Sequence, residues 1–184
     1  SIFNAINTAA AAVPTKERTA SDYVDLGKAA LVLGADPASV LEKYYGVAKR
    51  TEARGENVPD GRLEAYLAAG ELALEKDDFE RAGKEFQEAY RLVPNHPEVL
   101  FGLARSFMPS DRQVATGYLK RVIEKAPYHF GALLTLAESA IKYERYDVAA
   151  DFLTEIESVN ERHPLAAAFR AVLIELEWND EVGF

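Results

Sequence analysis

The chain has 184 residues, of which 48% are hydrophobic and 28% charged, and its formal net charge is −9. This composition is globular and too apolar for a disordered chain, and no apolar run reaches the ~18–20 residues that span a bilayer, so we expect a soluble protein. The acidic balance disfavours nucleic acid and favours basic or apolar partners. The sequence holds no cysteine, which excludes disulfides and thiolate chemistry.

The chain begins at Ser1 without a methionine and shows no secretory signal pattern. We therefore expect a processed chain or a piece of a longer one, and the localisation stays unknown. Residues 1–20 predict an N-terminal helix or arm that ends near Pro14. Its apolar stripe consists of Ile2, Phe3, Ile6, Ala9, Ala10 and Val13. This helix either docks on the unit that follows or serves as an arm for self-association.

Residues 21–50 predict a degenerate pair of helices. The first helix carries Tyr23, Leu26, Gly27 and Ala30, and the second carries Leu41, Tyr45 and Ala48. Between them, Asp36 suits an N-cap and Pro37 the first turn of the second helix, and the turn holds an extra residue or two. Residues 51–62 follow as a long loop, of a length that is often mobile or functional.

Three units then repeat over residues 63–96, 97–129 and 130–163, with periods of 34, 33 and 34 residues. Apolar residues at helical spacing predict two helices in each unit. Small residues recur in register where the two helices of a unit approach within ~8–10 Å. They are Gly70, Ala104 and Ala137 on the first helices, and Ala82, Ala115 and Ala149 on the second. Pro94 and Pro127 end second helices, because proline cannot continue a helix.

This pattern resembles the tetratricopeptide-repeat (TPR) family over about residues 63–163. The resemblance implies an all-α fold, a right-handed α-α superhelical solenoid of helix pairs, with residues 1–184 as a single array. It also implies that one stripe of each first helix lines a concave face that binds another polypeptide. Some members hold a peptide carboxylate with lysine and asparagine residues, and this chain departs from that pattern because its stripe contains no asparagine.

The concave stripe is expected to form a peptide-binding groove. Its candidate residues are Lys28, Leu67, Glu71, Leu74, Phe101, Arg105, Met108, Leu134, Glu138 and Ile141, with Val24 and Leu31 beside Lys28. The charges of Lys28, Glu71, Arg105 and Glu138 alternate in sign. Arg105 either bridges Glu71 and Glu138 between units, or reads an acidic group on a bound peptide while the apolar residues grip its side chains.

Residues 164–178 predict a further first helix that is apolar nearly all round from Leu165 to Leu176. A terminal helix normally presents a polar outer face. Either its second helix is missing because the chain is cut here, or another molecule covers the face, as in a homo-oligomer.

The sequence predicts no catalytic residue, no cofactor and no metal site, and hence no enzyme. The three histidines, His96, His129 and His163, precede new first helices at equivalent positions. Equivalent positions lie about 10 Å apart, too far for one shared metal ion. We expect a protein-protein interaction scaffold. Two alternatives stay open: an accessory segment of a larger bacterial multidomain enzyme of peptidase type, which the stretch from Val159 to Leu173 weakly resembles, or a self-assembly module.

Overall fold

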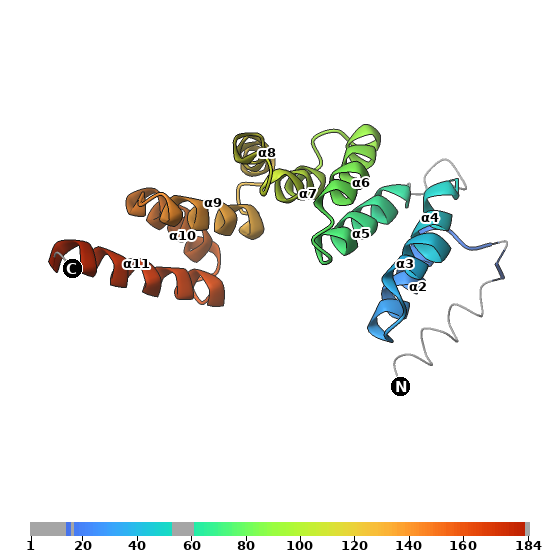
Figure 1. Ribbon diagram of the computed structural model, residues 1–184, viewed down its shortest axis with the longest axis horizontal. Helices are drawn as coiled ribbons and strands as arrows, with labels where there is room; N and C mark the ends of the chain where they lie inside the picture. Colours follow the sequence, from blue (N-terminus) through green and yellow to red (C-terminus); the bar gives the residue numbers. More distant parts are fainter. Residues whose placement is uncertain (1–13, 16, 53–60, 183–184) are drawn as a thin grey trace.

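The computed structural model describes residues 14–15, 17–52 and 61–182, with side chains up to Leu176. The loop predicted over 51–62 and the N-terminal stripe lie mostly outside these residues. Every element of the described ranges is a helix. In chain order they are α2 (Ala20–Val32), α3 (Pro37–Val40), η1 (Leu41–Tyr45), α4 (Gly46–Arg50), α5 (Arg62–Leu74), α6 (Phe79–Leu92), α7 (Pro97–Phe107), α8 (Arg112–Lys125), α9 (Phe130–Lys142), α10 (Tyr146–Val159) and α11 (Pro164–Val182). The helices form an elongated array with α2 and α11 at opposite ends (Figure 1).

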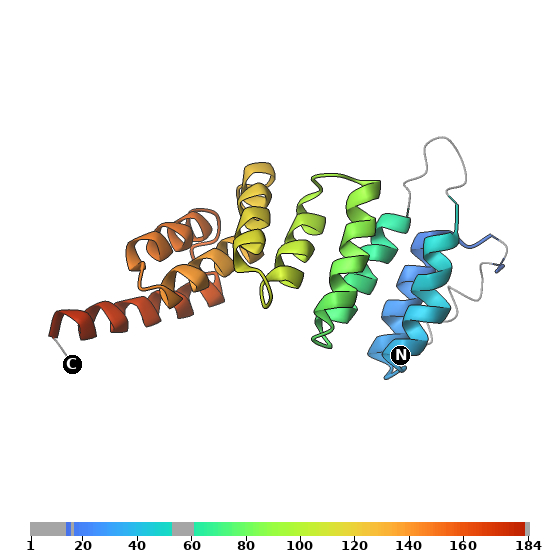
Figure 2. The same cartoon turned by 45° about the horizontal axis from the view of Figure 1, so that its top comes forward.

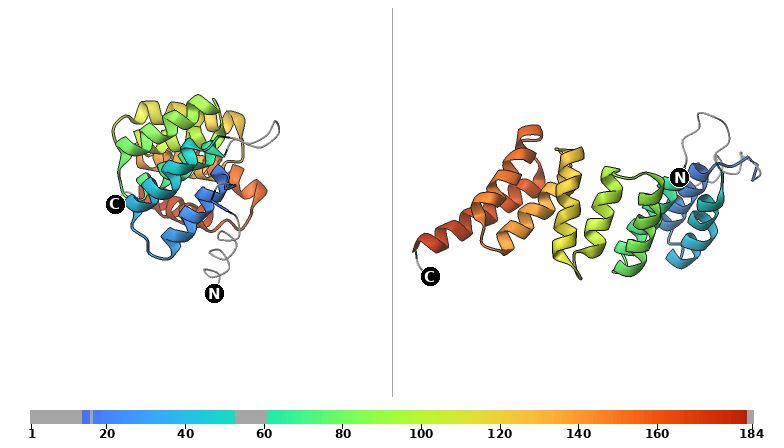
Figure 3. Two further views of the ribbon diagram at one scale, coloured as in Figure 1. Left: turned by 90° about the vertical axis from the view of Figure 1, so that its right-hand side faces the viewer. Right: turned by 90° about the horizontal axis from the view of Figure 1, so that it is seen from above.

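The array is built from helix pairs that stack side by side (Figure 2). Within the units, α5 contacts α6, α7 contacts α8, and α9 contacts α10. First helices also contact one another, α2 with α5 and α5 with α7, and these contacts are more extensive than those between successive second helices. The array is arched (Figure 1), and the first helices line the inner side of this bend because they contact one another more extensively than the second helices do. In the view along the long axis, successive helix pairs are rotated relative to one another (Figure 3). The predicted all-α superhelical solenoid is therefore confirmed.

The turns are fixed by residues with special backbone or capping properties. Asp36, Asp78 and Asp111 accept backbone N–H groups at the starts of α3, α6 and α8, which satisfies donors that a helix leaves unpaired. Asp77 and Glu144 adopt the left-handed conformation just before second helices, with φ of 55° and 57°. The predicted cap Asp36 and first-turn Pro37 are confirmed.

The small residues of the repeat admit large ones from a neighbouring helix. A Cβ placed on Gly70 would lie 2.6 Å from the ring of Phe86, and one on Gly102 would overlap the same ring. Phe86 is fully buried between α5 and α7 as a result. The buried side chains form a succession of clusters along the array instead of one centre.

The second helix of the first pair is irregular. One continuous helix was expected through Leu41, Tyr45 and Ala48, but η1 inserts a π-helical turn between α3 and α4. A π-turn holds one residue more than an α-turn, so some surplus length of this unit is taken up inside the helix and not in the turn before it. Tyr45 is 1% exposed and packs against Gly27, where a Cβ would overlap its ring.

Helix α11 runs from Pro164 to Val182, four residues beyond the predicted end at Trp178. The extension is understandable because the sequence offers no glycine or proline before Gly183. Ala166 and Leu173 are buried against α9 and α10, whereas Ile174 is 62% exposed. One side of the helix is thus covered by the preceding unit and the other is not.

Candidate functional site

The predicted stripe lies on successive first helices of the inner side. Its central residues, on α5, α7 and α9, form a row of partly exposed apolar and charged side chains. The partly exposed apolar members are Leu67, Phe101, Met108, Leu134 and Ile141. All of these also pack against buried core clusters, so they form the floor of the inner face and do not project from it.

A hollow of about 340 Å³ opens on this face where α5, α7 and α9 approach one another. Its lining combines an apolar base with a few polar groups: Leu74, Asp77, Phe79, Arg105, Met108, Pro109 and Thr135. Three of the predicted groove residues, Leu74, Arg105 and Met108, thus meet around one space. Its volume is in the range of a pocket for a small ligand or for one or two side chains. Asp77, Phe79, Pro109 and Thr135 were not among the predicted site residues, because turn residues and neighbouring helix faces do not follow the stripe spacing.

Arg105 is held by an acid of the preceding unit. Its Nη1 lies 2.6 Å from Oε2 of Glu71, and its guanidinium carbon lies 5.6 Å from the centre of the Phe101 ring. Both partners of the ion pair are only partly exposed, at 37% and 45%. The predicted bridge to Glu138 is wrong, because Glu138 forms no ion pair with Arg105 within the described ranges. Glu138 is exposed on α9.

Phe101 joins α7 to the start of α9. Its ring centre lies 4.7 Å from that of His129, and a Cβ placed on Gly131 would lie 2.8 Å from Cζ of Phe101. His129 caps α9 by accepting the N–H of Ala132 at Nδ1, while its Nε2 lies 3.3 Å from a carboxylate oxygen of Glu98. Nδ1 is therefore the acceptor, and Nε2–H can donate to Glu98. Phe101 therefore connects the floor of the inner face to the start of α9.

One of the three stripe residues predicted on the first helix of the degenerate unit is buried. Val24 is fully buried in the core, so it is not presented on the inner face. Lys28 is 61% exposed and lies 4.0 Å from Asp25. Leu74 is 7% exposed and still borders the central hollow. Apart from Leu31 on α2, the partly exposed apolar residues of the predicted stripe lie on α5, α7 and α9 and in the turn after α7.

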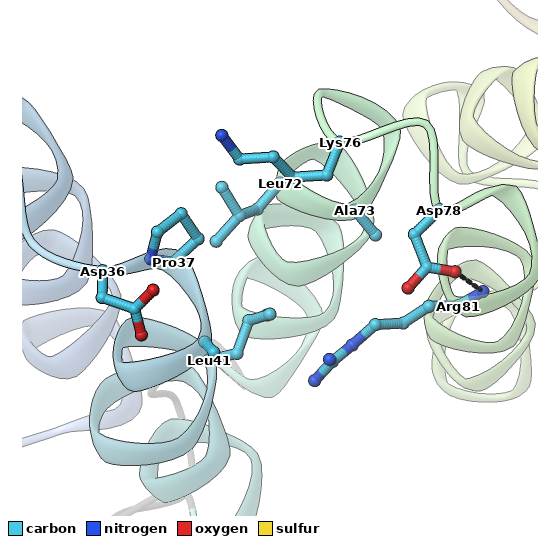
Figure 4. A pocket seen from close by; sticks show the side chains of 9 residues that line it. Asp36, Pro37, Leu41, Leu72, Ala73, Lys76, Asp78 and Arg81 are labelled. Carbon is cyan, nitrogen blue, oxygen red and sulfur yellow. Dashed lines mark hydrogen bonds between the residues drawn. The ribbon is translucent and has the colours of Figure 1, made fainter.

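A second hollow of about 380 Å³ lies at the junction of the first two helix pairs (Figure 4). Its lining residues are Asp36, Pro37, Ala38, Leu41, Leu72, Ala73, Lys76, Asp78 and Arg81. The side chain of Arg81 extends toward Leu41, and Lys76 extends past Leu72 toward Pro37. Two cations and two carboxylates share this lining, so its net charge selects no class of ligand. The sequence pattern did not predict this hollow, because its lining joins the start of one second helix to the end of α5 and the start of α6 in the next pair.

The uncovered face of α11 carries several exposed apolar residues. Leu165, Val172 and Ile174 are 56%, 44% and 62% exposed. In the repeat register, Ala171 and Ile174 match Ala104 and Phe107 of α7. Ala104 shares a core cluster with Leu119 of α8, and the Phe107 ring stacks on that of Tyr118. Patches of this kind often mark interfaces. The predicted self-association through this helix stays a prediction.

The three histidines lie directly before α7, α9 and α11. His163 accepts the N–H of Ala166 as His129 accepts that of Ala132, whereas Nδ1 of His96 is buried without a hydrogen-bond partner. Within the described ranges, no three His, Asp or Glu side chains gather in a way that would hold a metal ion. Among the same residues, no helix has the length and apolar character needed to cross a bilayer.

The sequence matches no protein-family model, and it matches no curated protein. The fold, in contrast, has clear counterparts among solved structures. A tetratricopeptide repeat protein from Parabacteroides merdae superimposes with a TM-score of 0.67 at 17% identity, over 87% of this chain and 60% of that one. This chain therefore spans less than two thirds of that protein's crystallised chain.

Two further counterparts have similar scores. YrrB, described as a TPR protein with an unusual peptide-binding site, gives a TM-score of 0.61 at 17% identity, over 83% of this chain and 74% of that one. MamA from Desulfovibrio magneticus gives 0.59 at 18% identity, over 87% and 96%. The molecule is thus an α-solenoid of stacked helix pairs. Its fold is the tetratricopeptide-repeat fold, as the repeat pattern predicted.

Proposed function

We propose that the protein is a protein-protein interaction scaffold that binds a segment of another polypeptide along the inner face of α5, α7 and α9. The observation that carries this proposal is the hollow bordered by Leu74, Arg105 and Met108. It lies on the inner side of the bend, where several helices contribute to one surface.

The chemistry of the hollow supports binding of a side chain. Leu74, Phe79, Met108 and Pro109 supply apolar contact, and full burial of a leucine or phenylalanine side chain contributes about 1.5–3 kcal/mol. Arg105 and Thr135 add polar groups that can orient a backbone. Methionine suits such a surface, because its unbranched side chain adapts to different partners.

The solved counterparts support the same class of function. YrrB is described by its peptide-binding site, which shows that a solenoid of this shape can hold a peptide. Since the identity is 17%, the support extends to the architecture and not to particular residues.

The proposal is tested with a cellulose-bound array of random-sequence peptides, followed by fluorescence polarisation of the peptides that bind. Met108→Lys places a charge in the hollow and is expected to weaken those peptides at least about tenfold, since an apolar contact is replaced by a buried cation. Val114→Lys is the matched control, because Val114 is 40% exposed on α8 outside the hollow. If both variants lost the same affinity, or if Met108→Lys lost none, the peptides would not bind in this hollow.

A further inference from the structure

We infer that the segment bound in the inner groove is basic: it places one apolar side chain in the hollow and lysine or arginine side chains beside it. This inference rests on the proposed function and specifies the chemistry of the partner. It is drawn from the charges that border the hollow and from which of them are already paired.

Arg105, the cation that lines the hollow, already has an acidic partner. Arg105 is paired with Glu71 at 2.6 Å and stacked near Phe101, so an incoming carboxylate would have to displace an existing partner. An acidic ligand would also meet the negative charges nearby. The alternative in which Arg105 reads an acidic group on the peptide is therefore the less favourable one.

The acids around the hollow are more available. Asp77 borders the hollow and is exposed in a left-handed turn. Glu138 lies three residues after Thr135 on α9, and residues at this spacing are neighbours on a helix surface. Glu138 is exposed and has no ion-pair partner within the described ranges. A cationic side chain next to the anchored residue can therefore reach an unpaired carboxylate on either wall.

Other charges on the inner side preserve the acidic balance. Glu98 is 59% exposed, and the group beside it is the imidazole of His129. Glu64 lies seven residues before Glu71, on the same face of α5, and is exposed. Lys142, at the last position of α9, is the exposed cation of that helix and lies four residues from Glu138. Lys76, beside Asp77, is exposed and extends toward Pro37 of the second hollow. Exposed acids thus outnumber exposed cations around the central hollow, and electrostatic complementarity favours a basic partner.

The test uses three series of fluorescein-labelled synthetic peptides that differ in their flanking residues, which are lysine, glutamine or glutamate on both sides. Within each series the central residue is leucine, isoleucine or phenylalanine. Fluorescence polarisation at low salt is expected to rank the flanks lysine, then glutamine, then glutamate. The preference should shrink as salt is raised, because exposed charges are screened within about 10 Å at 0.1 M.

Glu138→Gln and Asp77→Asn each remove one carboxylate and keep the side-chain shape. Each is expected to weaken the lysine series by about two- to fivefold and to leave the glutamine series unchanged. Glu124→Gln is the matched control, since Glu124 is exposed on the second helix α8, and it should change neither series.

The outcomes separate this inference from the proposed function. Stronger binding of the glutamate series, still weakened by Met108→Lys, would overturn the basic partner and leave the groove in place. Equal binding of all three series, with no effect of Glu138→Gln or Asp77→Asn, would overturn it as well. If no series bound, or if Met108→Lys had no effect on binding, the groove itself would be lost together with the inference.

Discussion

The guanidinium of Arg105 on α7 lies 2.6 Å from the carboxylate of Glu71 on α5, so neighbouring units are joined by an ion pair across the inner face. The two residues are 34 positions apart in sequence, which is one repeat. The repeat therefore places opposite charges at equivalent positions of successive helices. The pair both connects the units and neutralises the cation of the central hollow.

Removing Arg105 should expose this double role. In a double-mutant cycle with Arg105→Gln and Glu71→Gln, we expect a coupling of about 0.2–1 kcal/mol in the free energy of unfolding, because both groups are more than a third exposed. Urea unfolding measures it. Arg105→Gln also frees Glu71, so it should strengthen binding of the lysine-flanked peptides. Weaker binding of these peptides would contradict the role assigned to Arg105.

The ion pair between Lys49 and Glu85 should matter more to stability. The two side chains are only 16% and 14% exposed, their charged atoms lie 2.5 Å apart, and the Lys49 ammonium lies 4.8 Å from the Tyr66 ring centre. Glu85→Gln leaves a poorly solvated cation with a weaker partner, and we expect a loss of about 1–3 kcal/mol. Glu80→Gln, in the exposed Lys84–Glu80 pair, is the control and should leave the urea midpoint unchanged.

Two glycines in helices should respond in opposite directions to alanine. Gly102→Ala would drive a methyl group into the ring of Phe86, and we expect a loss of about 1–3 kcal/mol or more. A Cβ placed on Gly117 of α8 would meet no neighbouring atom within 4 Å, so Gly117→Ala should stabilise by about 0.5–1 kcal/mol through helix propensity. Thermal unfolding followed by circular dichroism distinguishes them. A stable Gly102→Ala protein would mean that Phe86 can move aside.

The His129 cap at the start of α9 should contribute to the free energy of unfolding. His129→Ala removes the acceptor for the Ala132 N–H and the ring contact with Phe101, and a loss of about 0.5–2 kcal/mol is expected for the cap. His129→Asn keeps a capping oxygen and should recover part of that loss. Urea unfolding of both variants tests this, and equal losses would show that the cap contributes little.

Alkaline pH should destabilise the first helix pair through Tyr45. Burial, and next the charge of Glu75, raise the pKa of Tyr45 above its ordinary value of 10.0. The unfolded chain therefore loses this proton at lower pH than the folded chain. Stability is retained below about pH 10 and falls as the pH rises above it. Tyr45→Phe should reduce this fall without removing it, because burial also raises the pKa of Tyr66. An unchanged pH profile in Tyr45→Phe would refute the assignment.

Much of the architecture could be predicted from local rules. Proline, N-caps and small residues in register act within a few positions of each other, and Asp36, Pro37 and Gly70 behave as these rules require. The π-turn at Leu41–Tyr45 could not be predicted, because its hydrogen-bond pattern depends on how the helix packs and leaves no composition signal.

The site was predictable in outline only. Helical spacing placed Arg105 and Met108 on one face. It could not predict which acid pairs with Arg105, because Glu71 and Glu138 occupy equivalent positions in the units before and after that of Arg105. The burial of Val24 likewise depends on how the irregular first pair packs against α5. Turn residues such as Asp77 join the hollow through backbone geometry that the stripe spacing does not contain.

The stacking of each helix mainly on its immediate neighbours has a consequence for how the molecule opens. Helix α11 contacts α9 and α10 and is uncovered on its other side, so its amide protons should exchange with solvent sooner than those of α7, which is enclosed by α5, α6 and α8. A segment seated between α5 and α9 would slow exchange in the middle of the array and leave the α11 end almost untouched. Binding of a segment would then be detected as amide-exchange protection that is greatest near α7 and decreases toward α11.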